Sequence, residues 1–160
     1  MEHLWSPWRF RYVTKAASEE GCVFCNKLST GSDEENLVVY RGTYNYIVLN
    51  LDPFTSGHLM VVPFQHVALL DELDPATAGE MMELTRVATR HLREIYKPTG
   101  LNLGMNLGES AGAGVAGHVH MHVLPRWVGD TNFMTAVGET RVMPEDLSET
   151  WRKLRTAFNR

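Results

Sequence analysis

Three histidines alternate with apolar residues in the segment GHVHMHVLPRW, residues 117–127. Residues two apart on an extended strand project from the same face. His118, His120 and His122 are therefore expected to share one face of a β-strand, while the apolar residues between them point into a core. The chain contains seven histidines, and core packing gives no reason to place three of them in one row. The row indicates a site where chemistry takes place.

Two kinds of chemistry suit such a row. Imidazoles two apart on a strand can converge on one metal ion, with a ligand from elsewhere completing a catalytic centre. The only carboxylates close to the row in sequence are Glu109 and Asp130. In the other interpretation the middle imidazole is a nucleophile, because its neutral ring nitrogen attacks phosphorus near pH 7 without a separate base. The resulting phosphoramidate is labile, so a second acceptor can displace it.

The loop before the row, GESAGAGVAG at residues 108–117, is rich in glycine and alanine. Small residues allow backbone N–H groups to approach an anion, as they do in phosphate nests. A flexible connector is the simpler explanation, but a connector seldom needs so many small residues directly beside a histidine row. Phosphate binding is therefore favoured. A phosphate cradle next to imidazoles indicates phosphoryl or nucleotidyl transfer.

Both cysteines lie in one motif, Cys22-Val23-Phe24-Cys25. In a reducing compartment this spacing is typical of half a metal site or of a redox pair. A redox pair is expected to follow a strand and to open a helix, whereas polar residues 18–21 precede this motif, so a metal turn is favoured. A structural zinc needs two further ligands, for which histidine is a common choice. Two reduced thiols beneath an N-terminal segment are the alternative.

The strands that must position these residues are predicted from alternation and from turn residues. Four of them precede the histidine strand, at residues 37–40, 44–50, 58–63 and 101–106.

The helices are predicted from caps and from apolar spacing. The main helix begins with Asp74 as N-cap and Pro75 at the first helical position, and it ends before residue 97. A short helical turn is expected at 67–73 and a C-terminal helix at 144–158, with an irregular segment or an extra hairpin at 128–143. Strands on both sides of one main helix predict an α+β domain on an antiparallel sheet of about five strands.

Composition and charge narrow the classes of function. The chain has 160 residues, of which 44% are hydrophobic and 21% charged, as in one globular domain. A net charge of −4 argues against a general nucleic-acid binder, although a few local donors could still hold a phosphate. No apolar run approaches the roughly 20 residues of a membrane span, and the N-terminus lacks the apolar region of a secretory signal. We expect a cytoplasmic protein with no membrane partner.

The segment from His118 to Leu124 matches the signature His-φ-His-φ-His-φ-φ, and the chain resembles the histidine triad (HIT) superfamily of nucleotide hydrolases and transferases. CVFC at 22–25, LNLDPFTSGHLMVVPFQH at 49–66 and MNLGESAGAGVAGH at 105–118 also resemble that family at appropriate separations. The resemblance implies a HIT-like fold.

The resemblance also divides the chain into three parts. It covers residues 20–127 as a HIT domain, leaving an N-terminal arm at 1–19 and a C-terminal extension with a helix at 128–160. The arm, which contains Trp5 and Trp8, and the segment 129–147 look like a prokaryotic subgroup that includes diadenosine tetraphosphate phosphorylases and related hydrolases.

The resemblance implies a mechanism. His120 would attack the α-phosphorus of a nucleotide ester, anhydride or amidate, and water or inorganic phosphate would release the nucleotide from the histidyl intermediate. The second ring nitrogen of His120 would donate to a backbone carbonyl, and loop amides would stabilise the developing charge. Asn50 looks like the family position that binds the ribose, and without the family it would be interpreted as a turn cap. Asn106 matches a polar position on the phosphate side, and without the family it would be interpreted as a strand-edge amide. The expected nucleotide- and phosphate-binding residues are Asn50, Asn106, Gly112, Ala113, Gly114, Val115 and His122.

In zinc-bearing members of the family, the two cysteines are joined by the histidine of the P-x-x-H segment and by the first histidine of the triad. The corresponding residues here are Cys22, Cys25, His66 and His118, so the resemblance implies a structural Zn²⁺ and no organic cofactor. His58 matches a family histidine in G-H-x-φ-φ-φ-P and is interpreted as a buried, hydrogen-bonded residue outside the site.

One departure from the family concerns the glycine-rich loop. Many members carry Gln followed by Ser or Thr there, whereas residues 113–117 offer no side-chain donor, so the leaving group is not specified. The resemblance implies a purine nucleotide or dinucleoside polyphosphate as substrate and a homodimer formed through helix 75–96 and the strand near 101–106. Two alternatives stay open: a metal-dependent hydrolase that uses the triad as ligands, and a nucleotide-binding or scaffold protein with little catalysis.

Overall fold

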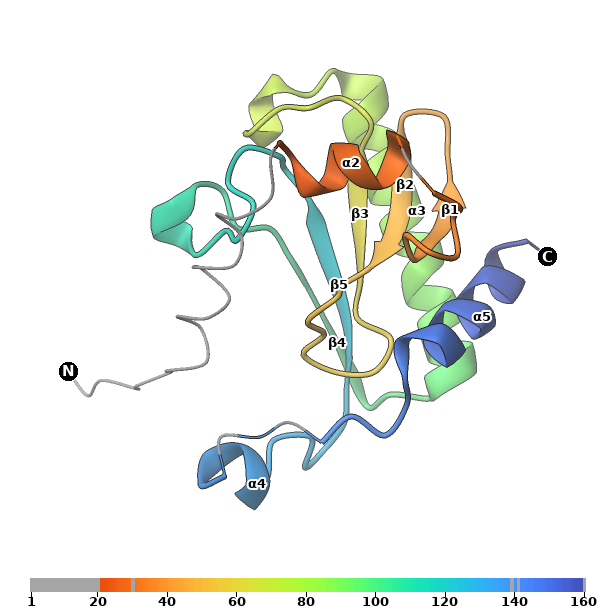
Figure 1. Ribbon diagram of the computed structural model, residues 1–160, viewed down its shortest axis with the longest axis vertical. Coiled ribbons are helices and arrows are strands. Elements are labelled where there is room, and N and C mark those ends of the chain that lie inside the picture. The colour runs from red at the N-terminus through yellow and green to blue at the C-terminus, as the bar shows by residue number, and fades with distance from the viewer. Residues whose placement is uncertain (1–20, 30, 139, 141, 160) are drawn as a thin grey trace.

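The computed structural model describes residues 21–29, 31–138, 140 and 142–159 (Figure 1). The predicted N-terminal arm lies outside the described residues. No helix in the described ranges has both the length and the apolar character needed to cross a membrane.

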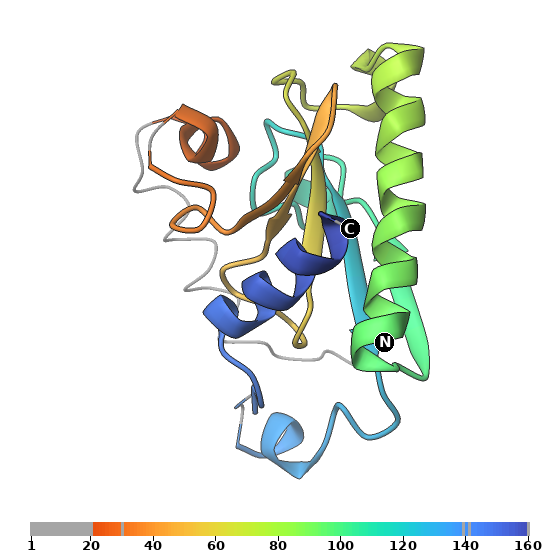
Figure 2. The ribbon, with the colours of Figure 1, turned by 90° about the vertical axis from the view of Figure 1, so that its right-hand side faces the viewer.

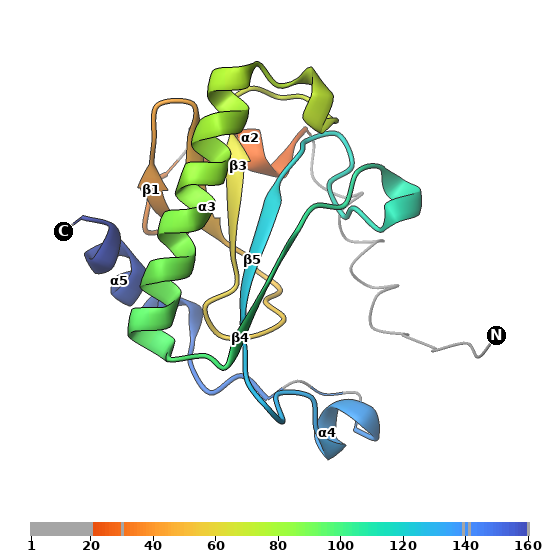
Figure 3. The same ribbon diagram turned by 180° about the vertical axis from the view of Figure 1, so that it is seen from behind.

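The core of the fold is one antiparallel sheet. Its strands are β1 (Val38–Arg41), β2 (Asn45–Leu49), β3 (Leu59–Pro63), β4 (Gly100–Gly104) and β5 (Met121–Arg126). They lie in the order β1-β2-β3-β5-β4, so the histidine segment enters the sheet between β3 and β4 (Figure 3). The predicted five-stranded α+β fold is confirmed.

Helices cover both faces of this sheet (Figure 2). The long helix α3 (Pro75–Tyr96) packs on one face, and α5 (Leu147–Phe158) joins it there by contacting α3 and β1. A short helix, α2 (Val23–Ser29), lies on the opposite face and buries Phe24. The central strands β2 and β3 are buried throughout because side chains pointing either way meet a helix.

Alternation along the strands separates the core into two clusters. Ile47 and Leu49 pack beneath α3, while Tyr46 and Val48 pack beneath α2. The apolar residues between the triad histidines belong to the α3 cluster, as predicted from their spacing. Met60 of β3 pairs with His122 of β5, and paired residues project to the same face. The triad therefore faces α2.

Helix α3 has the bounds that its caps predicted. The Asp74 carboxylate accepts hydrogen bonds from the N–H groups of Ala76 and Thr77, and the helix ends at Lys97 in the left-handed conformation with φ of 45°. Helix α5 begins three positions later than predicted because its N-cap is Asp146, whose side chain accepts from the N–H of Glu149.

Several predicted boundaries were wrong. Strand β5 starts at Met121, so His118 and His120 precede the regular strand. The reason is that β3 ends at Pro63, and the N–H of Val119 donates instead to the carbonyl of Val67. Strand β4 stops at Gly104, which leaves Asn106 in the following loop.

The short helical turn predicted at 67–73 is present as a 3₁₀ turn at Leu70–Glu72. The short helix α4 (Phe133–Ala136), in the segment 128–143, was not predicted. The described residues of that segment contain no strand, so the extra hairpin considered there is not formed.

Candidate active site

The three imidazoles lie in a row across the α2 face of the sheet. The His120 ring is 4.8 Å from the His122 ring and 4.9 Å from the Phe24 ring, measured between centroids. His118 and His120 are buried, with 0% and 4% of their surface exposed. Phe24 of α2 closes over the row, so the middle imidazole lies in a largely apolar environment.

His120 is held in one tautomer by the backbone. Its Nδ1 lies 2.8 Å from the carbonyl oxygen of His118, and a carbonyl can only accept, so Nδ1 carries the proton. Nε2 therefore keeps its lone pair. Burial lowers the pKa of His120 below its usual 6.5, more than the hydrogen bond to His118 raises it. The ring is neutral at pH 7 and has a nucleophilic nitrogen.

His122 is oriented by a residue that sequence reasoning left outside the site. Nε2 of His58 lies 2.9 Å from Nδ1 of His122. Nδ1 of His58 accepts from the N–H of Phe54 at 3.2 Å, so the proton of His58 is on Nε2 and is donated to His122. Nδ1 of His122 then accepts, which places the His122 proton on Nε2. Burial and the neighbouring His120 lower the pKa of His122 to about 4, so this imidazole acts as a neutral donor at pH 7.

A cavity of about 360 Å³ opens beside His120. Gly114 and Val115 of the glycine-rich loop line it, together with Asn50 at the end of β2. The cavity is lined by Gly21, Cys22, Val23, Phe24, Lys27, Leu49, Asn50, Leu51, Asp52, Met60, Gly114, Val115 and His120.

The loop that was predicted to bind phosphate divides its amides between two tasks. The N–H of Gly112 donates to Glu109 and that of Ala113 to Gly108, so these two amides stabilise the loop itself. Asn106 supports the same turn, its side chain donating to the carbonyl of Gly112 at 3.3 Å. Among the described residues, the N–H groups of Gly114 and Val115 donate to no backbone carbonyl. Both residues line the cavity beside His120.

Asn50 caps a turn, which is the alternative considered for it, and it also lies at the cavity wall. Its side-chain oxygen accepts from the N–H of Asp52 at 3.1 Å, which caps the turn after β2. Its amide nitrogen lies 3.4 Å from both ring nitrogens of His58, and the residue also lines the cavity. The turn therefore fixes an amide group at the cavity wall, near the histidine row.

The four predicted metal ligands form one cluster. The ligand atoms of Cys22, Cys25, His66 and His118 all lie within 4.8 Å of one another. The Sγ of Cys22 is 3.3 Å from Nδ1 of His118, and the Sγ of Cys25 is 3.4 Å from Nδ1 of His66 and 3.7 Å from that of His118. Zinc bond lengths in a tetrahedron imply ligand separations of roughly 3.3–3.8 Å. The cluster fits a zinc ion.

A hydrogen bond outside this cluster also prepares His118 to bind a metal. Nε2 of His118 lies 2.9 Å from the carbonyl oxygen of Pro63, so it carries the proton and leaves the Nδ1 lone pair for the metal. The tautomers argue against a catalytic metal held by both His120 and His122, because Nδ1 of His122 accepts from His58 and its Nε2 then carries the proton.

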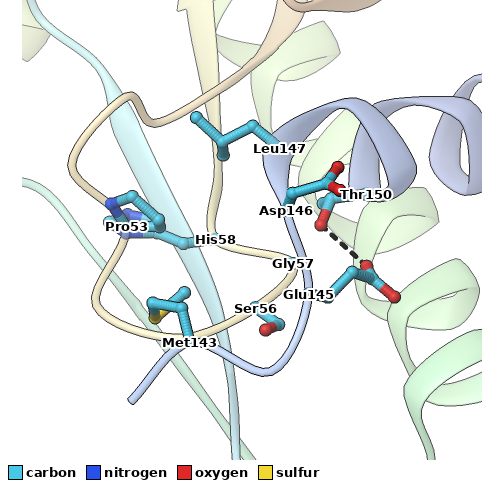
Figure 4. A pocket seen from close by; sticks show the side chains of 9 residues that line it. All are labelled: Pro53, Ser56, Gly57, His58, Met143, Glu145, Asp146, Leu147 and Thr150. Atoms are coloured by element: carbon cyan, nitrogen blue, oxygen red, sulfur yellow. Dashed lines mark hydrogen bonds between the residues drawn. The ribbon is translucent and has the colours of Figure 1, made fainter. Parts of the chain in front are cut away.

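A second cavity of about 210 Å³ also borders His58 (Figure 4). It lies between the loop after β2, which contributes Pro53 and Ser56, and the start of α5 with Asp146 and Leu147. The start of the C-terminal helix therefore faces the loop that positions His58 across this cavity.

The structure thus brings some predicted residues to one cavity and separates others. His120, Asn50, Gly114 and Val115 line the cavity, whereas Gly112, Ala113 and Asn106 lie in or brace the loop behind it. Sequence reasoning missed the contact of His58 with His122 and the positions of Phe24 and Lys27 in the cavity wall. The signals for the first two were the histidine at the start of a strand and the aromatic residue inside the cysteine motif.

The fold and the site define a class: an α+β domain with a histidine row beside a glycine-rich loop, and a Cys₂His₂ cluster behind the row. The HIT domain family matches residues 32–128, and the chain belongs to this family. It is 41% identical over 167 residues to a protein named AP-4-A phosphorylase from Mycobacterium tuberculosis, covering 100% of this chain and 86% of that protein.

Two further matches are a more distant enzyme and a solved structure. A bis(5'-nucleosyl)-tetraphosphatase (asymmetrical) from Schizosaccharomyces pombe is 29% identical over 108 residues, covering 68% of this chain and 57% of that protein. The crystal structure of a Zn-bound histidine triad family protein from Mycobacterium smegmatis has a TM-score of 0.69 at 30% identity, covering 90% of this chain and 95% of that one.

Proposed function

We propose that the protein is a nucleotide hydrolase or nucleotidyltransferase that acts on the α-phosphate of diadenosine polyphosphates through a nucleotidyl-histidine intermediate. One observation carries the proposal. The hydrogen bond from Nδ1 of His120 to the His118 carbonyl leaves Nε2 as a nucleophile at the wall of a cavity of nucleoside size.

The residues divide the reaction between them. Nε2 of His120 forms a bond to the α-phosphorus, and the bond from that phosphorus to the bridging oxygen of the leaving group breaks. The N–H groups of Gly114 and Val115 and the Nε2–H of His122 donate to the phosphate oxygens, where negative charge develops. Asn50 binds the ribose. Water or inorganic phosphate then attacks the phosphorus, and His120 is regenerated.

The names of the relatives support two different second acceptors. The relative that aligns with the whole chain is named a phosphorylase, which supports inorganic phosphate. The more distant relative is named a tetraphosphatase, which supports water. Phosphate is the acceptor that we propose, because the phosphorylase aligns with residues beyond the HIT domain.

Product analysis tests this function. The protein is incubated with diadenosine tetraphosphate, with and without inorganic phosphate, and the released nucleotides are identified by chromatography. ADP formed together with ATP only when phosphate is present means phosphorolysis, whereas AMP plus ATP means hydrolysis. Tight AMP binding without any product over a panel of adenylated compounds would support the binding or scaffold alternative instead.

The Cys₂His₂ cluster is proposed to hold a structural Zn²⁺. When bound, the ion supplies cross-links between α2, the loop that carries His66 and the residue that precedes the nucleophile. It takes no part in the chemistry on phosphorus. Thiols kept reduced for this purpose fit the cytoplasm, which is the proposed location.

A homodimer is proposed through the edge of the sheet. Strand β4 is an edge strand with mostly exposed residues, and Leu103 has 50% of its surface exposed. Met82 on α3 is 59% exposed. An uncovered edge with apolar side chains is prone to pair with another chain. Sedimentation at micromolar protein is expected to give twice the monomer mass, and Leu103→Glu is expected to yield monomers. A monomer in the unsubstituted protein would rule the dimer out.

A further inference from the structure

The cysteine pair lies at the start of helix α2. Cys22 immediately precedes the helix, and its carbonyl accepts the first helical hydrogen bond, from the N–H of Asn26 at 2.9 Å. Cys25 lies three positions later, so the two side chains are neighbours on one side of the first turn. A cysteine pair that opens a helix is one of the two features expected of a redox pair. The motif therefore suits a metal site and also has a feature of a reactive dithiol.

The two sulfur atoms are close enough to be joined with little movement of the backbone. The ligand atoms of the cluster, both Sγ atoms included, lie within 4.8 Å of one another. The Sγ atoms of Cys22 and Cys25 lie 3.3 and 3.7 Å from the same atom, Nδ1 of His118. A disulfide needs Cα atoms roughly 4.4–6.8 Å apart, a separation that residues three apart in a helical turn have. The pair can therefore form a disulfide inside one chain.

Solvent reaches the cluster from one side. His118 is buried, whereas His66 is exposed and both cysteines are partly exposed. The exposed end is where the Sγ of Cys25 lies 3.4 Å from Nδ1 of His66, and Cys22 lies nearer to His118. A small oxidant therefore reaches the Cys25 sulfur without unfolding of the chain.

The same turn of α2 also forms part of the cavity beside His120. Cys22 lines this cavity together with Val23 and Phe24. Phe24, which lies between the two cysteines, contacts His118 and His120 at ring-centroid distances of 5.5 and 4.9 Å. Helix α2 has only seven residues, so its position depends on contacts such as these. A change at the cysteine pair is therefore expected to disturb the cavity wall.

We propose that Cys22 and Cys25 are a site of reversible oxidation by hydrogen peroxide, and that their disulfide releases the metal and weakens nucleotide binding. The Cys25 thiolate attacks one peroxide oxygen, the O–O bond breaks, and a sulfenic acid and hydroxide are formed. The Cys22 thiolate then attacks the sulfenic sulfur, the S–S bond forms, and the S–O bond breaks to release a second hydroxide. Two electrons pass from the sulfurs to the peroxide, and two protons from solvent convert the hydroxides to water.

The disulfide leaves His66 and His118 as the remaining ligands, and two imidazoles do not complete the four-ligand site that zinc prefers. The inference rests on the proposed zinc site, because release requires that the metal is bound beforehand.

The test treats the zinc-loaded native protein with a stoichiometric amount of hydrogen peroxide. After desalting, elemental analysis is expected to show loss of the zinc, and peptide mass mapping is expected to show a disulfide between Cys22 and Cys25. Dithiothreitol with added zinc should reverse both changes. The dissociation constant of AMP, measured by calorimetry, is expected to rise about fivefold or more on oxidation, the usual lower range of coupling between two sites, and to recover on reduction.

The variant Cys22→Ser/Cys25→Ser is the control for oxidation elsewhere, since the chain also contains eight methionines. Its affinity for AMP is expected not to respond to peroxide, and a response as large as that of the native protein would overturn the proposal. In the native protein, the proposal is overturned if the cysteines end as sulfinic acids without a disulfide, or if the affinity for AMP is unchanged once the disulfide has formed.

The same measurements separate this proposal from the others. Untreated protein that contains no zinc would contradict both the metal site and this proposal, whereas zinc that stays bound while both thiols stay free contradicts this proposal alone. None of the readouts requires turnover. Failure to cleave any dinucleotide would therefore refute the proposed function, and a reversible disulfide with weaker AMP binding would still support the oxidation site.

Discussion

At the scale of single residues, the site depends on which ring nitrogen of each histidine carries a proton. The His118 carbonyl fixes the proton of His120 on Nδ1, and His58 fixes that of His122 on Nε2. Two chemically identical side chains are thereby given opposite roles, one as a nucleophile and the other as a donor. These assignments come from hydrogen bonds to neighbours and not from the histidines themselves.

Replacement of the nucleophile is the first test at this scale. His120→Asn is expected to lower kcat by about 10³-fold or more, because the variant lacks the Nε2 nitrogen that is proposed to form the covalent intermediate. The melting temperature and the dissociation constant of AMP are expected to change little. Mass spectrometry of the native protein mixed with substrate should detect a nucleotidyl adduct that the variant lacks. Retained turnover in His120→Asn would eliminate His120 as the nucleophile.

His58 is expected to act by positioning His122. In His58→Leu, Nδ1 of His122 loses its donor and the proton can move from Nε2, so kcat is expected to fall about 10–100-fold, the range typical of outer partners of functional imidazoles. KM should change much less. His58→Gln keeps an N–H donor and is expected to recover part of kcat. Equal loss in both variants, parallel to a loss of thermal stability, would indicate a role in packing alone.

At the scale of elements, α3 holds the β1–β2 turn through one carboxylate. Glu80 accepts hydrogen bonds from the backbone N–H groups of Thr43, Tyr44 and Asn45 at 2.7–2.8 Å, and a further one from the Asn45 side chain. Burial acts to raise the pKa of Glu80, but these hydrogen bonds outweigh it, so the pKa lies below its usual 4.5. The helix thus anchors the hairpin whose second strand, β2, ends just before Asn50.

This anchor predicts a pH-dependent stability. A carboxyl whose pKa is lower in the folded state contributes stability that is complete above pH 4.5 and is lost as the pH falls below it. Glu80→Gln is expected to reduce the free energy of unfolding by about 1–3 kcal/mol at pH 7. The difference from the native protein should shrink below pH 4.5. Urea titrations across this range give both values.

Glu83 on the same helix provides the matched control. Its carboxylate pairs with Arg86 on the exposed surface, where ion pairs contribute little to stability. Glu83→Gln is expected to leave the unfolding midpoint nearly unchanged. An effect as large as that of Glu80→Gln would show that the loss comes from net charge instead of the turn.

At the scale of the whole molecule, the Cys₂His₂ cluster connects parts of the chain that are far apart in sequence. It joins the start of α2 to His66 after β3 and to His118 before β5. Helix α2 has only seven residues, which is too short to be stable alone in water. The burial of Phe24, together with the proposed metal, would therefore hold in place the helix that covers the site.

Removal of the metal tests this role. Elemental analysis should find one zinc per chain, and chelation is expected to lower the melting temperature by about 5 °C or more because the binding free energy contributes to folding. Cys25→Ser is expected to lose the metal and to become insensitive to the chelator. Turnover should fall only in step with the loss of structure. If chelation stopped turnover while the melting curve stayed unchanged, the metal would be catalytic.

The sequence determined those features of the fold that depend on neighbours along the chain. The bounds of α3 were predictable because Asp74, Pro75 and the 3.6-residue apolar spacing are all local signals. The apolar side chains between the three histidines were predictable as core residues, because successive residues of a strand point to opposite faces. The metal ligands other than the cysteine pair were predictable only through the resemblance to a family, since they lie more than 40 residues away.

Only the tertiary structure decided which distant groups meet. The antiparallel pairing of β3 with β5 brings His58 to His122 across 64 positions, and this contact sets the tautomer of the triad histidine. Helix α2 carries no strong local signal, and it forms where Phe24 can be buried against the sheet, which brings Lys27 to the cavity. Local spacing determines the direction in which a side chain points, but strand pairing and packing determine what it contacts.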